Sequence, residues 1–67
     1  MAVARVSEVI ASSKKGWQDA TDEALKRASK TLRGITGIEV IRQQAKVVNN
    51  KIVEYRVTIK ILFLLDE

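Results

Sequence analysis

The sequence lacks both cysteine and histidine, and this double absence excludes several classes of protein. Without cysteine there is no disulfide and no thiolate ligand, and without histidine the usual zinc sites cannot be built, so we predict no metal-ligating residue. Cysteine or histidine catalysis is excluded as well, and no pair of carboxylates with a fixed spacing lies in a predicted loop. We therefore expect a protein that is not an enzyme.

Long apolar runs are missing too. No stretch approaches the roughly 18 residues that a membrane-spanning helix needs. The segment from Met1 to Ile10 carries Arg5 and Glu8, and it has neither the apolar stretch nor the cleavage site of a signal peptide. We expect a cytoplasmic protein with no membrane association, and the lack of cysteine fits a reducing compartment.

The net charge is +4, but the chain contains no run of basic residues. A nucleic-acid-binding protein gathers lysine and arginine into a patch that displaces the counterions of the phosphate backbone. Here twelve basic residues are interspersed with eight acidic ones, which favours a surface that keeps the protein soluble. Nucleic-acid binding remains a less favoured alternative.

The chain has only 67 residues, which is room for a single domain spanning residues 1–67. A domain of this size buries only about 60% of the surface of its unfolded chain and usually needs additional stabilisation. Since disulfides and zinc are excluded, association with further copies of the same chain is the remaining source of that stabilisation.

The clearest pattern predicts a strand over about residues 52–65. From Val53 onward its odd positions are all apolar, whereas its even positions from Glu54 onward are polar until Leu62 and Leu64. The odd positions are Val53, Tyr55, Val57, Ile59, Ile61, Phe63 and Leu65. Asn49 and Asn50 precede this strand and predict a tight hairpin turn, because asparagine tolerates positive φ. The partner strand is expected over about 37–48, with a bulge around residues 42–44 where its alternation slips.

A helix is predicted over about residues 15–33. Its apolar stripe is rich in small residues, and Asp22 and Glu23 lie four residues before Lys26 and Arg27, the favourable direction for ion pairs. The stripe contains Trp17, Ala20, Ala24, Ala28 and Leu32. Ser12 or Ser13 is expected to cap the start of this helix, and Gly34 to end it. We interpret Trp17 and Tyr55 as anchors of the core or of a subunit contact.

A further strand over about residues 3–11 completes an α+β fold with the order strand, helix, strand, strand. The helical crossover makes the first two strands parallel, and the hairpin returns the third strand between them, giving the order 1-3-2. A strand of about 13 residues runs roughly 40 Å, whereas about 16 helical residues span only about 24 Å. One helix therefore leaves much of this antiparallel sheet uncovered, and we expect a homo-oligomer to cover it.

Several segments, in order along the whole chain, resemble the dodecins, small flavin-binding proteins that assemble as hollow dodecamers. These segments are residues 12–20, residues 28–33, Glu39-Val40, residues 54–60 and Phe63. The resemblance implies a homododecamer that holds FMN, FAD or riboflavin between symmetry-related sheets.

Four positions depart from the flavin-binding pattern of that family. Gly37 stands where the family has the tryptophan that stacks on the flavin, and Arg56 stands where it has a glutamine that bonds the flavin. Gln44 and Leu64 each replace an arginine. Arg56, Gln44 and Gly37 are the candidate ligand-binding residues, and we expect weak flavin binding or a different small ligand. The alternative is a structural or partner-binding oligomer with no flavin.

Overall fold

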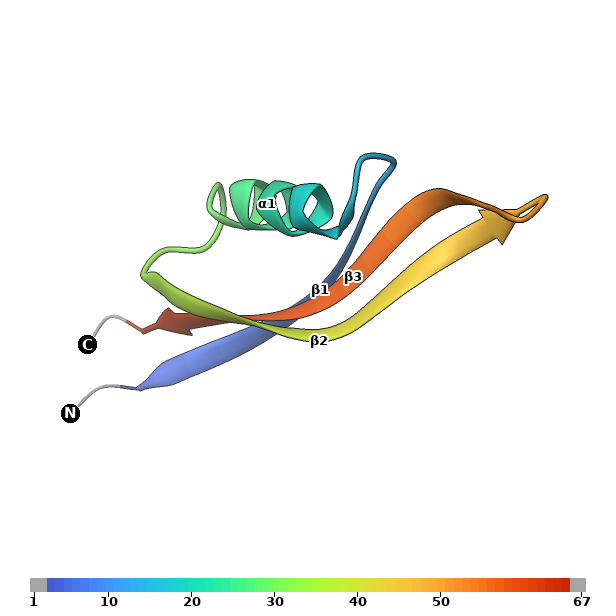
Figure 1. Cartoon of the computed structure of the whole chain (residues 1–67). Helices are drawn as coiled ribbons and strands as arrows, with labels where there is room; N and C mark the ends of the chain where they lie inside the picture. Colours follow the sequence, from blue (N-terminus) through green and yellow to red (C-terminus); the bar gives the residue numbers. More distant parts are fainter. Residues whose placement is uncertain (1–2, 66–67) are drawn as a thin grey trace.

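The computed structural model describes residues 3–65, which form one helix and three strands. The elements are β1 (Ala4–Ser13), α1 (Trp17–Ala28), β2 (Ile35–Val48) and β3 (Lys51–Leu64). β3 lies between β1 and β2 and pairs with both in the antiparallel sense, so the predicted order 1-3-2 is confirmed. The helix packs on one face of this sheet, as Figure 1 shows.

The helix is shorter than the predicted 15–33, and its start is not capped by a serine. Because Ser12 and Ser13 still pair with β3, they belong to β1, and Gly16 occupies the N-cap position without a side-chain hydrogen bond. Ser13 instead stabilises the connection to the helix. Its Oγ accepts a hydrogen bond from the backbone N–H of Lys15 at 2.9 Å and donates one to Asp19 Oδ2 at 2.6 Å.

Gly34 does not end the helix either. α1 stops at Ala28, and the amides of Thr31 and Leu32 both donate to the carbonyl of Ala28. Gly34 lies just before β2, where φ is +73° and a Cβ would come within 3.1 Å of the carbonyl oxygen of Leu64. Glycine is therefore required at this position for the chain to pass close to β3.

The hairpin between β2 and β3 has the predicted asparagine turn. Asn49 and Asn50 both have positive φ, of 54° and 65°, as a type I′ turn demands. The predicted irregularity in β2 is also present, but it lies slightly earlier than residues 42–44. The register shifts between Val40 and Arg42, so that Ile41 has no partner on β3. This bulge changes the face on which the following residues of β2 lie.

The core lies between α1 and the middle of β3. Val57, Ile59 and Ile61 are fully buried, as the alternation of β3 predicts, and they pack against Ala20 and Ala24 of the helix. The small alanine side chains allow the helix to approach the sheet closely. These five residues are the only buried ones in the part of the chain that the structure describes, and such a core is small for an independent domain.

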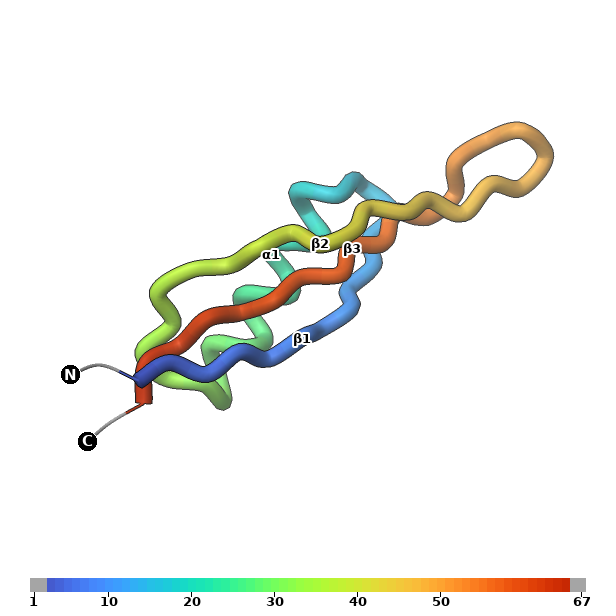
Figure 2. The backbone as a smooth tube through the Cα atoms, turned by 90° about the horizontal axis from the view of Figure 1, so that it is seen from below, coloured from blue at the N-terminus to red at the C-terminus, as the bar shows by residue number. Residues whose placement is uncertain are grey.

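The subunit is elongated, with extents of 52 × 19 × 13 Å. Its radius of gyration is 13.9 Å, compared with about 11 Å for a compact domain of this length. The reason is the distal part of the hairpin, residues 46–54, which continues beyond the last residue pair of β1, Ser13 and Tyr55. Figures 1 and 2 show this two-stranded arm projecting past the helix. Two strands alone are marginally stable in water, so the arm needs further contacts.

Candidate ligand-binding face

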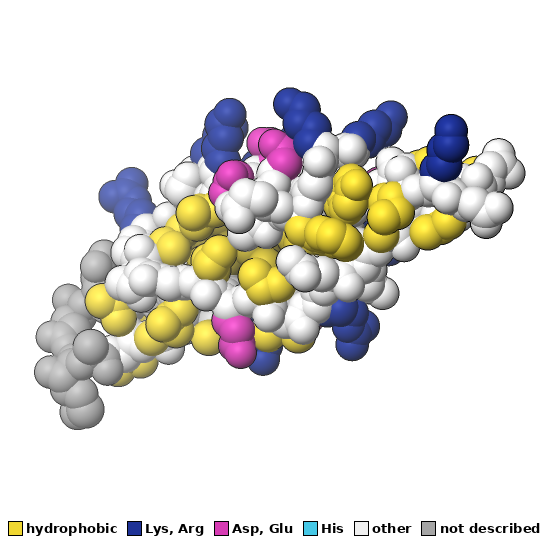
Figure 3. All heavy atoms as spheres, in the orientation of Figure 1, with side chains coloured by type: hydrophobic (Ala, Val, Ile, Leu, Met, Phe, Trp, Pro, Cys, Tyr) yellow, Lys and Arg dark blue, Asp and Glu magenta, His cyan; other side chains and the backbone are white. Residues whose placement is uncertain are grey.

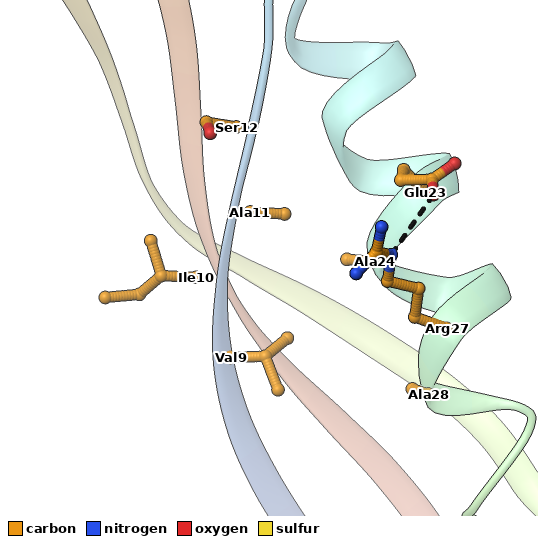
Figure 4. Close-up of a pocket in the computed structure, with 8 residues that line it drawn as sticks. All are labelled: Val9, Ile10, Ala11, Ser12, Glu23, Ala24, Arg27 and Ala28. Carbon is orange, nitrogen blue, oxygen red and sulfur yellow. Dashed lines mark hydrogen bonds and ion pairs between the residues drawn. The ribbon is translucent and has the colours of Figure 1, made fainter.

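The sheet has two faces of different character. The helix covers the face that carries Val57, Ile59 and Ile61, and we call the opposite side the open face. Because directly paired residues of antiparallel strands lie on the same face, the register assigns each position of β1 and β2 that has a partner on β3 to one side. Figure 4 agrees, since Val9 and Ala11 point toward α1 whereas Ile10 and Ser12 point away from it.

One part of the open face is apolar and exposed. Leu62 pairs with Val6 on one side and with Gly37 on the other. Val6 is 55% exposed and Ile10, farther along the same strand, is 67% exposed. Exposed aliphatic side chains gathered on one face indicate a surface that is covered by another protein or by a ligand.

The accessible surface of the whole chain gives the same indication. It is 5329 Å², whereas a monomeric protein of 7.5 kDa is expected to expose about 4,250 Å². The excess of about 1,100 Å² exceeds the roughly 800 Å² that each partner buries in a standard protein–protein interface. The isolated subunit therefore exposes more surface than a monomeric protein of its mass, as expected for a subunit of an oligomer.

The remainder of the open face is polar apart from Ile10, which pairs with Thr58. Lys60 lies between Glu8 of β1 and Glu39 of β2, so its charge has a carboxylate on each side. Toward the arm, Thr58 pairs with Arg42, and Arg56 pairs with Gln44 in the next register position. The face thus changes from apolar at Leu62, through a row of mixed charge, to a basic region near the arm.

The structure brings together two of the three predicted site residues. Arg56 and Gln44 are direct cross-strand partners, and they line a shallow pocket of about 280 Å³ together with Ala45, Lys46 and Glu54. Arg56 Nη2 lies 3.7 Å from Glu54 Oε2, which makes a loose ion pair at half-exposed side chains. Loose surface pairs of this kind contribute little to stability and leave the guanidinium able to bind a ligand.

Gly37, the third predicted site residue, lies elsewhere in the same subunit. Its partner Leu62 is six positions along β3 from Arg56, which corresponds to about 20 Å at the rise of a strand. A Cβ at Gly37 would meet no atom within 4 Å, so the space above this residue is empty. The backbone of Gly37 therefore borders an open gap beside Leu62.

Trp17 supports the Gln44–Arg56 pair from the helix side of the sheet. Its Nε1 donates a hydrogen bond to the backbone carbonyl of Gln44 at 3.0 Å. Its ring packs edge-on against Tyr55, with ring centroids 4.9 Å apart and an interplanar angle of 77°. Trp17 thus connects the start of α1 to both strands at the point where the arm begins.

A second hollow lies on the other side, between α1 and β1. It measures about 550 Å³, and its floor is made of small apolar residues that include Ala11, Ala24 and Ala28. Glu23 and Arg27 form an ion pair of 3.3 Å at its rim, which Figure 4 shows. Figure 3, in the orientation of Figure 1, shows apolar side chains along the middle of the molecule and on the arm, with basic side chains projecting around them.

The described residues contain neither a membrane-spanning helix nor a cluster of metal ligands. No helix among residues 3–65 has the length and apolar character needed to span a membrane. Within the same range, no three acidic side chains come together in a way that could hold a metal ion.

Sequence reasoning missed Arg42 and Lys46, which share the basic region with Arg56. Strict alternation places Arg42 on the same face as Val40, toward the helix. The bulge at Ile41 moves Arg42 to the open face, and no glycine or proline in that stretch marks the bulge. Apart from its charge, nothing in the sequence marks Lys46 as a residue of this face.

Known proteins provide an independent comparison. Residues 3–66 match the profile of the family described as Dodecin. No curated protein matches the chain. Among solved structures, the dodecin from Streptomyces davaonensis is 30% identical, with a TM-score of 0.91 over 98% of this chain and 97% of that chain.

Two other structures show the range of the similarity. An arginine-to-alanine variant of the dodecin from Thermus thermophilus is 31% identical, with a TM-score of 0.94 over 100% of both chains. The calcium-chelating antigen calcium dodecin from Mycobacterium tuberculosis is 28% identical, with a TM-score of 0.82 over 96% of this chain and 91% of that chain. The family profile covers nearly the whole sequence, the fold agrees from end to end, and this chain belongs to the dodecin family.

Proposed function

We propose that this chain is a single-domain subunit of a cytoplasmic homo-oligomer, a dodecamer as in the family, that binds and stores a small ligand. The observation that carries the proposal is the uncovered sheet face, with its exposed apolar residues and about 1,100 Å² of excess surface. Sequestration between subunits would be its mechanism, and no side-chain arrangement in the described residues suggests catalysis.

The ligand site is proposed to form between copies rather than within one subunit. Gly37 lies about 20 Å from the Gln44–Arg56 pair along β3, too far for one small ring to reach both. A second subunit that faces the first across a symmetry axis would bring its own Gln44 and Arg56 toward Gly37. The apolar side chain of Leu62 beside Gly37 would then contact one face of a flat ligand.

By resemblance to the family, the ligand is a flavin: FMN, FAD or riboflavin. With glycine in place of the stacking tryptophan, the site lacks an aromatic contact worth about 1 kcal/mol, which corresponds to about fivefold in affinity. We therefore expect flavin binding that is saturable but weaker than in a protein with the ring.

The replacement Gly37→Trp tests this proposal. The backbone at Gly37 has no positive φ, and a side chain there meets nothing within 4 Å, so the strand should accept tryptophan. Gly37→Trp should bind riboflavin at least about fivefold more tightly than the wild-type protein, measured by quenching of flavin fluorescence. Gly37→Ala is the matched control, because it adds a Cβ without a ring.

Native mass spectrometry of the purified protein provides the second measurement. A twelve-subunit mass with bound flavin would support both parts of the proposal. A dodecamer in which neither the wild-type protein nor Gly37→Trp binds any flavin would favour the alternative of a structural or partner-binding oligomer. A monomer would contradict the assembly.

A further inference from the structure

The arm, residues 46–54, has an apolar side that is exposed in the subunit. Val47 follows Ala45 by two residues in β2, so both lie on the helix side of the sheet, and Ile52 pairs with Val47. Val47 is 59% exposed and Ile52 is 50% exposed. On the same side, farther along β3, the core residues are buried under α1. The arm thus continues the apolar side of the sheet beyond the part that the helix covers.

The helix of the same subunit does not reach this side of the arm. α1 begins at Trp17, whose ring packs against Tyr55 at the base of the arm. Ile52 is three positions beyond Tyr55, which corresponds to about 10 Å at the rise of a strand. A two-stranded ribbon is marginally stable in water unless its apolar side is packed. In an oligomer of one kind of chain, the cover for the arm has to come from another copy.

The hollow between α1 and β1 has a matching size and character, and we call it the α1–β1 groove. It measures about 550 Å³, and small side chains line its floor, among them Ala11, Ala24 and Ala28 (Figure 4). Residues 9–12 form its wall on β1, a length of about 13 Å along the strand. Residues 51–54 of the arm have the same length of about 13 Å. The groove therefore has room for one side of the arm.

The charges at the two surfaces are of opposite sign. The helix edge of the groove carries two carboxylates and one guanidinium, whereas the arm carries two ammonium groups and one carboxylate. These groups belong to Asp19, Glu23 and Arg27 on the helix, and to Lys46, Lys51 and Glu54 on the arm. Exposed pairs contribute little stability, but complementary charge orients two surfaces as they meet.

From these two surfaces we propose that the arm of each copy binds in the α1–β1 groove of another copy, with Val47 and Ile52 packed against the alanines of its floor. Large side chains that face small ones interdigitate without leaving voids. This contact lies on the opposite side of the sheet from the open face, so the oligomer would use two separate interfaces. The inference rests on the homo-oligomer proposed above and adds the segment and the groove that join its copies.

Cross-linking between copies tests the contact, because the chain contains no cysteine and single thiols can be introduced at each surface. Val47→Cys and Ala28→Cys are prepared separately, mixed in the unfolded state and refolded together. Each copy then has one thiol, so a link between positions 47 and 28 necessarily joins two copies. A short bis-maleimide should give this two-subunit product, identified by peptide mass spectrometry. Val48→Cys, on the other side of the same strand, is the matched control and should give far less of it.

The reactivity of a thiol at position 47 provides a measurement that does not depend on the length of a linker. In the isolated subunit it would react with a maleimide about as fast as a thiol at Lys51, since both positions are exposed. In the oligomer, Val47→Cys should react at least about tenfold more slowly than Lys51→Cys, because a covered group reacts only when the contact opens. Ala28→Phe, added to both variants, fills the groove and should restore the fast reaction.

Native mass spectrometry of each variant shows whether the oligomer is intact. An intact oligomer in which position 47 reacts as fast as position 51 overturns the inference and leaves the proposed homo-oligomer standing. A protected thiol at position 47 that links to another surface, and not to position 28, also refutes the inference. If the wild-type protein is a monomer, both the inference and the proposed assembly fail.

Discussion

The covering of the open face is tested most directly by placing a charge at Ile10. In the isolated subunit this side chain is 67% exposed, and a substitution at such a surface position changes stability by only about 0.5 kcal/mol. If further subunits cover the face, Ile10→Asp buries a carboxylate in every copy. Even with Arg56 as its diagonal neighbour on β3, removing this charge from water costs several kcal/mol per site. The two situations differ about tenfold in free energy, so the measurement discriminates between them.

The assay combines native mass spectrometry with thermal unfolding followed by circular dichroism. An effect of 0.5 kcal/mol would lower the melting temperature of a domain of this size by about 2–4 °C. We expect Ile10→Asp to abolish the oligomer and to lower the melting temperature far beyond that range, because the small core alone stabilises the monomer poorly. Lys30→Asp, at an exposed position after α1, is the control for an added aspartate. An intact oligomer with the thermal stability of this control would refute the reasoning.

Two further predictions concern the framework of the subunit. Gly34→Ala should lower the free energy of unfolding by about 1–3 kcal/mol, because alanine disfavours φ of +73° and its Cβ would approach the carbonyl oxygen of Leu64. The free energy is measured by urea titration. A titration that shows no change would contradict the close approach of Gly34 to Leu64. Trp17→Phe should lower it by about 0.5–1.5 kcal/mol, because phenylalanine keeps the ring contact with Tyr55 but cannot donate to the carbonyl of Gln44. If the loss of this anchor also loosens the pair of Gln44 and Arg56, the affinity for FMN will fall in Trp17→Phe as well, whereas an unchanged affinity would show that Trp17 contributes to stability alone.

The local elements of this protein were predictable because their signals lie close together in the sequence. Alternation in β3 identified Val57, Ile59 and Ile61 as the buried face, and the two asparagines identified the turn. The start of the helix was predicted less well. Serine is a good N-cap by itself, but here pairing of Ser12 and Ser13 with β3 extends the strand to Ser13, which tertiary structure alone decides.

The sequence predicted only part of the candidate site, again because pairing between distant strands decided the rest. The resemblance to the dodecins indicated Arg56, Gln44 and Gly37 as positions that matter, but it contained no information on which of them share a subunit's surface. The register brings Arg56 and Gln44 together and separates both from Gly37. Their proximity is a property of strand pairing, which no single segment of sequence specifies.

The sequence by itself therefore determined the order of elements, the buried face of β3 and the need for partners, since these follow from periodicity, turn residues and chain length. Tertiary structure alone decided which residues β2 contributes to the open face. One extra residue in β2, Ile41, reverses the side on which the rest of the strand presents its side chains. Without it, Arg42 and Gln44 would lie on the side of Val40, against the helix. Because the period of a strand is two, a bulge of one residue exchanges the faces and places Arg42 and Gln44 beside Arg56 on the open face.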